Sequence, residues 1–230
     1  REWVWSTLGV WPGEGGLEVV DVDTDGRTDI VLATDTDYYY TNGRGRWLQL
    51  RLEDSFEQTW SSLTHAEDLR LLRTVETSSG IDVVLADGDE LFVHDGRSKV
   101  LRRTILTGAS GMSALAVADL DAQGGLEALV CDSEALYAYD YETGLQLSVK
   151  YGFGCSDLAL GQIDADPALE VALAGNAFGG ILLDGGTLDV DWLYLPGFET
   201  KVRLSDVDHD GLDEAVTMAD GNQTLQAVDP

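Results

Sequence analysis

The feature that most constrains the fold of this chain is an acidic stretch of nine residues that recurs five times. Its clearest copy, D-V-D-T-D-G-R-T-D at residues 21–29, has carboxylates at positions 1, 3, 5 and 9 and glycine at position 6. This spacing wraps several oxygens around a hard cation such as Ca²⁺. The other copies are weaker, and an apolar run follows each of them. The five copies begin at Asp21, Thr74, Asp119, Gln162 and Asp206.

The distance between copies is nearly constant and closes on itself. Between the ninth positions of successive copies the spacings are 53, 45, 43 and 44 residues. From Glu214 through the C-terminus and on from Arg1 to Asp29 the spacing is 45. Repeats of this length with strand-like content form stacked or radial arrays, and only in a ring does the count continue across the termini. The sequence therefore predicts a ring of five units.

Each unit reads as four short strands, and amphipathic helix periodicity is nearly absent. In the third unit we expect strands at 112–118, 128–131, 135–140 and 145–151, and in the first unit at 17–20, 29–33, 38–41 and 47–52. Four antiparallel strands in about 45 residues are typical of a propeller blade. We predict an all-β, five-bladed β-propeller of four-stranded antiparallel blades in a single domain, 1–230. The approximate blades are 16–52, 68–106, 112–151, 155–195 and 200–230.

The last unit is one strand short at the C-terminus. The stretch E-W-V-W-S-T-L-G at 2–9 resembles D-W-L-Y-L-P-G at 191–197, the outer strand of the fourth unit. We therefore expect residues 2–8 to complete the last blade and to remove an open sheet edge. The alternative is a piece of a larger propeller.

Charge limits the class of partner. The net charge is −28 and the pI is near 4.1, so nucleic acid and anionic membranes would be repelled. Solubility or salt adaptation and cation binding both account for such acidity. No run of 18 apolar residues occurs, so we expect no direct membrane insertion. The chain opens on Arg1 without a signal peptide, and we expect a processed chain or an excised domain of a larger one.

The chain has two cysteines, Cys131 and Cys155. Two are too few for a disulfide framework or a zinc site. Each lies in a predicted strand of adjacent repeats, so a single bridge is the alternative, but we expect buried free thiols.

The pattern D-x-D-x-D-G-x-x-[DE] followed by an apolar strand resembles the FG-GAP or VCBS repeats of integrin alpha subunits and of many secreted bacterial proteins. The resemblance covers the whole chain as five repeats, where integrins have seven. Of the Phe-Gly and Gly-Ala-Pro signatures, only G-F-G at 152–154 and P-G-F at 196–198 are similar. The resemblance implies that each loop joins the first and second strands of a blade and carries Ca²⁺. An EF-hand is excluded because its glutamate at position 12 is replaced by Leu32 and Thr217.

The five loops differ in their expected affinity for Ca²⁺. The first and fifth are the strongest, and the third is weaker because Gln123 replaces a carboxylate. The fourth is weaker still, because Gln162 costs a charge and Pro167 cannot take the positive φ that glycine permits. The second should be empty. The expected ligands are Asp21, Asp23, Asp25, Asp29 and the Arg27 carbonyl; Asp206, Asp208, Asp210, Glu214 and the Leu212 carbonyl; Asp119, Asp121, Gln123 and Glu127; and Asp164, Asp166 and Glu170.

Catalytic motifs are absent from the sequence. It contains no G-x-S-x-G elbow, Walker loop or H-E-x-x-H, and its histidines are scattered at 65, 94 and 209. Carboxylate pairs are so numerous that none indicates acid–base catalysis, and cation binding explains their regular placement. We therefore predict that the chain is not an enzyme.

A partner would bind on the face opposite the calcium loops, where long loops carry aromatic residues. The candidates are Trp11, Phe56, Trp60, Phe153, Phe178 and Phe198, two of them in an expected insertion at 53–68. The alternative is that these rings seal the packing between blades. We predict a monomeric, Ca²⁺-stabilised adhesion or ligand-binding module, extracellular, on the cell surface or periplasmic, that binds a protein. The alternatives are a glycan-binding, lectin-like propeller and a scaffold domain of a larger secreted protein.

Overall fold

The computed structural model describes residues 10–37, 45–52, 57–63, 65, 69–219 and 224–230. Over these residues the chain is all-β, with nineteen strands and no helix, and so with no helix that could cross a membrane. The strands form five antiparallel sheets, one for each sequence repeat. The predicted fold class, a five-bladed β-propeller, is confirmed. The chain divides into two compact units, 1–107 and 108–230.

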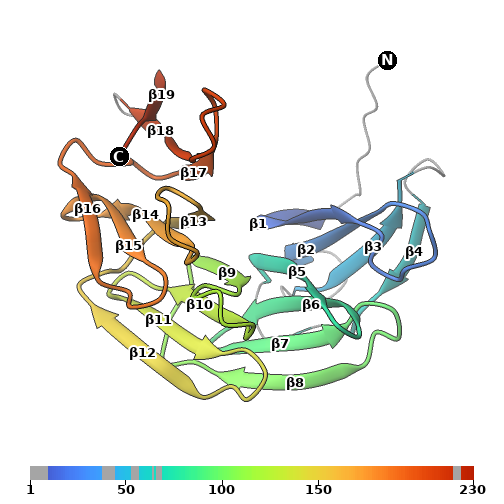
Figure 1. The fold of residues 1–230 in the computed structure, drawn as a ribbon. Coiled ribbons are helices and arrows are strands. Elements are labelled where there is room, and N and C mark those ends of the chain that lie inside the picture. The colour runs from blue at the N-terminus through green and yellow to red at the C-terminus, as the bar shows by residue number, and fades with distance from the viewer. Residues whose placement is uncertain (1–9, 38–44, 53–56, 64, 66–68, 220–223) are drawn as a thin grey trace. The chain divides into compact units, whose positions relative to one another are not determined.

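The first unit contains two four-stranded sheets whose strands pair in chain order (Figure 1). One sheet comprises β1 (Val10–Val20), β2 (Asp29–Asp37), β3 (Trp47–Arg51) and β4 (Glu57–Ser61). The other comprises β5 (Leu71–Thr77), β6 (Gly80–Asp87), β7 (Glu90–Asp95) and β8 (Leu101–Leu106). The first strands of the two sheets, β1 and β5, contact each other. Their shared core includes Val31, Trp47, Leu72, Val83 and Leu85.

The second unit contains two four-stranded sheets and one of three described strands. The first has β9 (Ala114–Ala118), β10 (Glu127–Cys131), β11 (Ala135–Asp140) and β12 (Gln146–Tyr151). The next has β13 (Asp157–Gly161), β14 (Glu170–Asn176), β15 (Gly179–Asp184) and β16 (Val190–Tyr194). The last has β17 (Val202–Ser205), β18 (Glu214–Ala219) and β19 (Thr224–Val228). The fourth strand expected here, residues 2–8, lies outside the described residues, so this closure stays a prediction.

The apolar runs after the acidic loops become the second strands of their sheets, buried on both faces. In β10, Ala128 to Cys131 are fully buried, and in β14 so are Val171 to Ala174. A short continuous apolar run is what a strand covered on both sides requires. Each buried Val or Leu side chain contributes about 1.5–3 kcal/mol. Because this surface is covered by the neighbouring sheet, no sheet could keep its core alone.

The first sheet differs from the sequence prediction in its outer half. The stretch 47–52, expected as the fourth strand, contains the third strand, because Trp47 pairs with Ala33 and Arg51 with Asp29. The fourth strand is β4, where Trp60 pairs with Gln49. The predicted insertion at 53–68 was therefore wrong in part. The expected third strand, 38–41, lies outside the described residues. The sequence E-Q-T-W-S of β4 gives no strand pattern, because an outer strand is half exposed and needs few apolar residues.

The expectation of free thiols was also wrong. Cys131 at the end of β10 and Cys155 just before β13 form a disulfide, with Cα atoms 5.6 Å apart. The bond joins two neighbouring sheets of the second unit. Its partners come together only through the packing of these sheets, which the sequence spacing of 24 residues does not reveal.

Candidate functional site: acidic loops and an aromatic cleft

Three of the acidic loops close by the same hydrogen bonds. These loops connect β1 to β2, β9 to β10 and β17 to β18. In the first, Asp21 at position 1 accepts the N–H groups of Asp25 and Gly26 at 3.0 and 2.8 Å. The same two bonds recur from Gln123 and Gly124 to Asp119, and from Asp210 and Gly211 to Asp206. The first carboxylate therefore shapes the loop around itself.

The backbone at position 6 explains the glycine of the repeat. At Gly26, Gly124 and Gly211 φ is 88°, 89° and 101°, which glycine adopts without strain. The fourth loop has Pro167 there, and no residue from 162 to 170 has positive φ. Instead, the Gln162 amide donates to the carbonyls of Asp164 and Asp166 at 3.0 and 2.5 Å. The fourth loop therefore has a different backbone, for the reason that its proline suggested.

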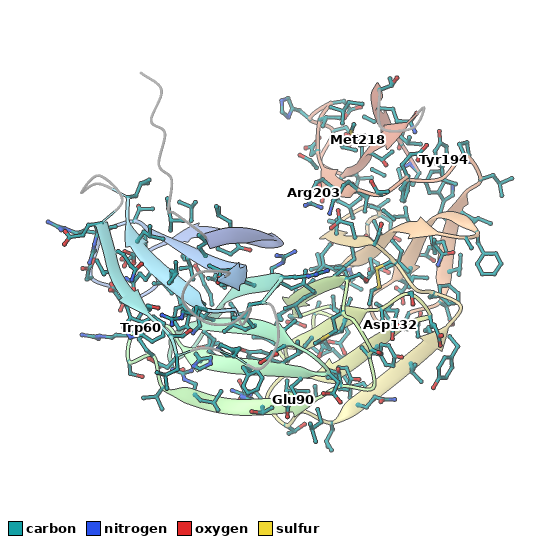
Figure 2. The ribbon with its side chains drawn as sticks, turned by 180° about the vertical axis from the view of Figure 1, so that it is seen from behind. Trp60, Glu90, Asp132, Tyr194, Arg203 and Met218 are labelled. Atoms are coloured by element: carbon teal, nitrogen blue, oxygen red, sulfur yellow. A yellow bond between two sulfur atoms is a disulfide. The ribbon has the colours of Figure 1, made fainter. Side chains whose placement is uncertain are left out.

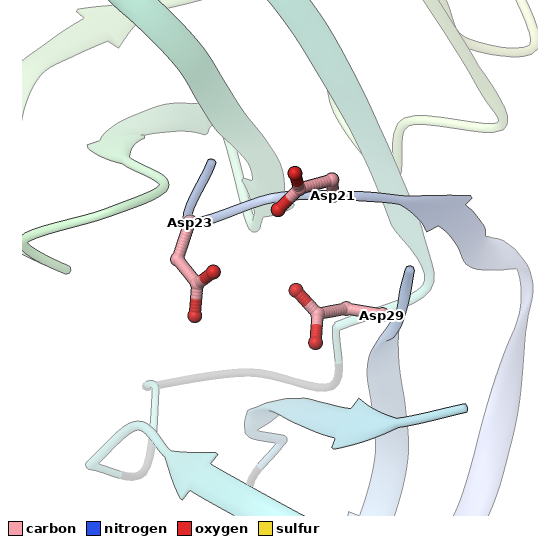
Figure 3. Close-up of side chains that lie close together, drawn as sticks. All are labelled: Asp21, Asp23 and Asp29. Carbon is pink, nitrogen blue, oxygen red and sulfur yellow. The ribbon is translucent and has the colours of Figure 1, made fainter. Parts of the chain in front are cut away.

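Four of the five loops bring three carboxylates together. Figure 3 shows this for Asp21, Asp23 and Asp29, whose oxygens point toward one space. In each cluster one oxygen from each residue lies within 4.8 Å of the others. The other clusters are Asp119, Asp121 and Glu127; Asp164, Asp166 and Glu170; and Asp206, Asp208 and Asp210. The second loop has shortened to a tight turn between β5 and β6, and its described residues form no such cluster.

The carboxylate at position 9 is buried in three of the four loops. Asp29 is 0% exposed, Glu170 2% and Glu214 6%, whereas Glu127 is partly buried. The side chains of Glu127, Glu170 and Glu214 each accept the N–H of their own loop's position 2, at 2.9, 2.6 and 2.7 Å. Burial raises the pKa of Glu127 and Glu170, and nearby aspartates raise it further. Burial likewise raises the pKa of Asp29.

Buried oxygens without a hydrogen-bond partner occur in two of these clusters, those of the first and fourth loops. Within the described residues, Oε1 of Glu170 accepts no hydrogen bond. The Gln49 amide and the Val22 N–H lie near the carboxylate of Asp29 and oppose the rise in its pKa, but neither makes a hydrogen bond of good geometry with it. A buried polar atom without a partner is costly, and a bound ion removes that cost. An all-oxygen set of this kind suits Ca²⁺ or Mg²⁺. Of the other predicted ligands, Asp25, Gln123 and Glu214 lie outside the converging sets, and the Arg27 and Leu212 carbonyls stay predictions.

The aromatic residues predicted to bind a partner differ in their exposure. Phe178 is 64% exposed, whereas Phe198 is fully buried and packs on Tyr194 with ring centroids 5.8 Å apart. Trp60 lies on β4 (Figure 2). Its ring packs on that of Trp47, with centroids 4.3 Å apart. Phe153 is partly buried against the core. Phe198 and Trp60 therefore belong to the packing, and among the candidates whose side chains are described only Phe178 is largely exposed. Trp11, on β1, has no described side chain, and Phe56 lies outside the described residues.

The second unit has a cleft of about 740 Å³ beside Phe178. Its walls come from the β10–β11, β12–β13 and β14–β15 connections, and Tyr151, Cys155 and Phe178 are among its lining residues. A hollow of about 410 Å³ lies on the other side of the Phe178 loop, lined by Leu195 and Glu199 among others. In an antiparallel sheet these connections lie at the strand ends opposite the acidic loops. The cleft is therefore on the predicted partner-binding face.

Hydrogen bonds fix the walls of this cleft. The Asn176 amide donates to the carbonyls of Gly152 and Gly154 at 3.2 and 2.9 Å, and its oxygen accepts the N–H of Phe178. The Ser156 hydroxyl donates to the carbonyl of Thr200 at 3.0 Å. The cleft is thus preformed, which lowers the entropic cost of binding.

Asp132 directly follows β10 (Figure 2) and holds the β10–β11 turn, whose Ser133 and Glu134 line the cleft. Its carboxylate accepts the N–H groups of Glu134 and Ala135, both at 2.8 Å, and the Tyr137 hydroxyl at 3.2 Å. Burial opposes ionisation, but these bonds and that from Ser110 N–H lower the pKa of Asp132 overall. Sequence reasoning missed this residue and Asn176. The available signal was an Asp or Asn directly after the apolar second strand.

A second motif repeats in three of the sheets. The turns between third and fourth strands read D-x-x-[ST], with the serine or threonine N–H donating to the aspartate. The pairs are Ser98 and Asp95, Thr143 and Asp140, and Thr187 and Asp184. Each aspartate is also the sheet partner of its repeat's ninth position. In the first sheet that place belongs to Arg51, opposite Asp29.

Two histidines of the first unit are partly buried beside its core. His65 pairs with Asp87, Nδ1 to Oδ2 at 3.2 Å, and its ring packs edge-on against Phe92. Nε2 of His94 is buried without a hydrogen-bond partner among the described residues. Burial lowers the pKa of both histidines, although Asp87 opposes the effect at His65. Both are structural residues.

Acid should therefore weaken the first unit. A lowered histidine pKa means that the unfolded chain binds more protons, so stability present above pH 6.5 is lost as pH falls through the folded-state pKa values. For each histidine, the free energy of unfolding falls by at most about 1.4 kcal/mol per pH unit. Urea unfolding at pH 7.5 and at pH 5.5 would measure this loss of unfolding free energy. The loss should be smaller in His94→Gln than in wild type, and unchanged in His209→Gln. Equal losses in wild type and His94→Gln would contradict this assignment.

Comparison with known proteins supports the β-propeller fold but does not assign the chain to a family. No protein-family model and no curated protein matches this chain. Among solved structures, the chain is similar to BBS1N, crystallised in complex with ARL6DN and soaked with lead. The TM-score is 0.72 at 10% identity, covering 96% of this chain and 67% of that one. It is also similar to the V. cholerae biofilm matrix protein Bap1, with a TM-score of 0.59 at 18% identity, covering 99% of this chain and 42% of that one.

These likenesses show the five-bladed β-propeller fold. At such low identity they carry no activity or ligand to this chain. Membership of the FG-GAP or VCBS group stays a resemblance carried by the acidic loops. What the chain does must be inferred from its own residues.

Proposed function

We propose that this chain is a non-enzymatic binding module that holds a protein partner in the cleft of its second unit and is stabilised by Ca²⁺ at its acidic loops. The observation that carries the proposal is the preformed cleft between Tyr151 and Phe178, 73% and 64% exposed. Large exposed aromatic residues on a rigid concave surface are characteristic of binding sites. The complex in which BBS1N was crystallised is consistent with a protein partner.

The polar groups of the cleft support binding rather than catalysis. The Asn176 amide and the hydroxyls of Ser113 and Ser156 all donate to backbone carbonyls. They hold the walls in place, and none is paired with a histidine. The chain's negative charge favours a partner with basic groups around an apolar side chain that enters the cleft.

Calcium and an extracellular location support each other. The acidic clusters offer oxygen ligands alone, the set that Ca²⁺ binds, and extracellular calcium fills sites with Kd values of about 10⁻⁴–10⁻³ M. The Cys131–Cys155 disulfide is stable in oxidising compartments such as the cell exterior and the bacterial periplasm. The likeness to a biofilm matrix protein agrees with this location.

Removing the exposed ring should abolish most of the binding. We expect Phe178→Ala to weaken affinity for the partner at least about tenfold, because aromatic anchors at the centre of an interface carry most of its energy. The measurement is capture from the secreted and surface fraction of the source, followed by titration of the captured protein. Leu147→Ala is the matched control, since Leu147 is 56% exposed on the outer strand β12.

Two results would decide against the proposed partner class. Equal affinity of Phe178→Ala and Leu147→Ala would show that the cleft is not the binding site. Binding on a glycan array that Phe178→Ala abolishes, without a protein partner, would favour the lectin-like alternative instead.

A further inference from the structure

The first acidic loop already holds a cation of its own, the guanidinium of Arg51. Arg51 lies on β3, opposite Asp29 in the sheet. Its Nη1 donates to both carboxylate oxygens of Asp25, at 2.8 and 2.7 Å, and its Nε lies 3.6 Å from Oδ1 of Asp29. Nε2 of Gln49, also on β3, donates to Asp23 at 2.8 Å. Three of the four acidic side chains of this loop therefore face donors from β3.

The second sheet repeats the arrangement. Nη1 of Arg102 on β8 lies 2.7 Å from Oδ1 of Asp82, the ninth position of the second loop. The same guanidinium also contacts Asp95, the sheet partner of Asp82. Asp82 is 0% exposed, as Asp29 is. In both sheets of the first unit, the buried carboxylate thus has an arginine beside it.

The third and fifth loops contrast with this. Among the described residues, no Lys or Arg lies within ion-pair distance of the carboxylates of Asp119, Asp121 and Glu127. The same holds for Asp206, Asp208, Asp210 and Glu214. In the fifth loop, Asp210 at position 5 lies in the acidic cluster, whereas Asp25 at the same position of the first loop is turned to Arg51.

We propose that Arg51 is the resident cation of the first acidic loop and excludes Ca²⁺ from it, whereas the third and fifth loops take the ion. The contrast between loops rests on the proposed calcium function. It differs from the order predicted from the sequence, in which the first and fifth loops are the two strongest sites. A Ca²⁺ ion that took Asp25 as a ligand would have to separate it from Arg51. An ion held by Asp21, Asp23 and Asp29 alone would still lie close to the positive guanidinium, whose Nε is 3.6 Å from Asp29. Both effects lower the affinity.

The glycine at position 6 reports each loop separately. The amide protons of Gly26, Gly124 and Gly211 are bonded to the first carboxylates of loops one, three and five. In amide spectra of the ¹⁵N-labelled full chain, CaCl₂ added after chelation should shift Gly124 and Gly211 to saturation. Gly26 should respond only at a concentration at least about tenfold higher, if at all.

Variants of Arg51 test the cause. In Arg51→Gln, which removes the charge, Gly26 should saturate at a calcium concentration at least about tenfold lower than in wild type. In Arg51→Lys, which keeps the charge, it should behave as in wild type. Arg73→Gln is the matched control, because Arg73 is in the same unit but its Nη1 lies 3.7 Å from Glu18.

The outcomes separate this inference from the calcium proposal. Gly26 and Gly211 saturating together in wild type would overturn the role of Arg51, and this comparison needs no variant to fold. An unchanged Gly26 response in folded Arg51→Gln would do the same. If neither Gly124 nor Gly211 responds in wild type, the calcium function fails. A new Gly26 response in Arg51→Gln would still establish Arg51 as the resident cation.

Discussion

Chelation of calcium should lower the melting temperature of this chain by about 10–20 °C. Ca²⁺ that binds only the folded chain stabilises it by RT ln(1 + [Ca²⁺]/Kd), about 2.7 kcal/mol per site at a hundredfold excess over Kd. The third and fifth loops together would contribute about 5 kcal/mol, and for a chain of this size each kcal/mol corresponds to about 2–4 °C. Without the ion, carboxylates such as Asp206, Asp208 and Asp210 repel one another at close range. High monovalent salt should recover part of the loss by screening.

A charge-matched pair of variants identifies the loops responsible. Asp121→Asn with Asp208→Asn keeps an oxygen that can accept the loop hydrogen bonds of Gln123 and Asp210 but removes one charge per site. Its melting temperature should depend little on calcium. Asp89→Asn with Asp229→Asn removes the same charge from exposed positions and should behave as wild type. If wild type melts at one temperature in chelator and in millimolar Ca²⁺, the loops are acidic turns and not metal sites.

The fold could be read from the sequence wherever the information was local. The nine-residue loop and the apolar run that follows it lie within about a dozen residues, so the sequence of each repeat predicts its first hairpin. The outer half of the first sheet could not be read in this way. The pairing of Trp47 with Ala33 is set by sheet register, and β4 is too polar to show a strand pattern.

The same limit applies to the candidate site. The convergence of Asp21, Asp23 and Asp29 follows from the loop itself, but the arginine opposite Asp29 comes from a strand that the sequence had placed one position too far out. Phe178 and Phe198 both stand beside glycine in apparent loops. Only the three-dimensional packing shows that Phe198, covered by Tyr194, belongs to the core, whereas Phe178 is on the surface.

Breaking the Cys131–Cys155 disulfide should cost the second unit about 3.5 kcal/mol. In the chain-entropy description, a crosslink between residues 24 apart restricts the unfolded chain by roughly that amount. The corresponding fall in melting temperature is about 7–14 °C. Cys155 also lines the cleft, and its carbonyl accepts the Ser113 hydroxyl at 2.5 Å. Reduction should therefore also loosen the cleft wall and weaken partner binding. Thermal melts of the oxidised and reduced chain measure the first effect.

The double variant Cys131→Ala with Cys155→Ala separates the bond from the side chains. It should melt near the reduced wild type and should not respond to a reductant, whereas calcium should still stabilise it, because the acidic loops lie at the other ends of β10 and β13. The disulfide and the calcium-binding loops then act on different connections of the second unit, so their losses should add. A reduced wild type that melts with the oxidised chain would show that sheet packing alone holds these two cysteines together.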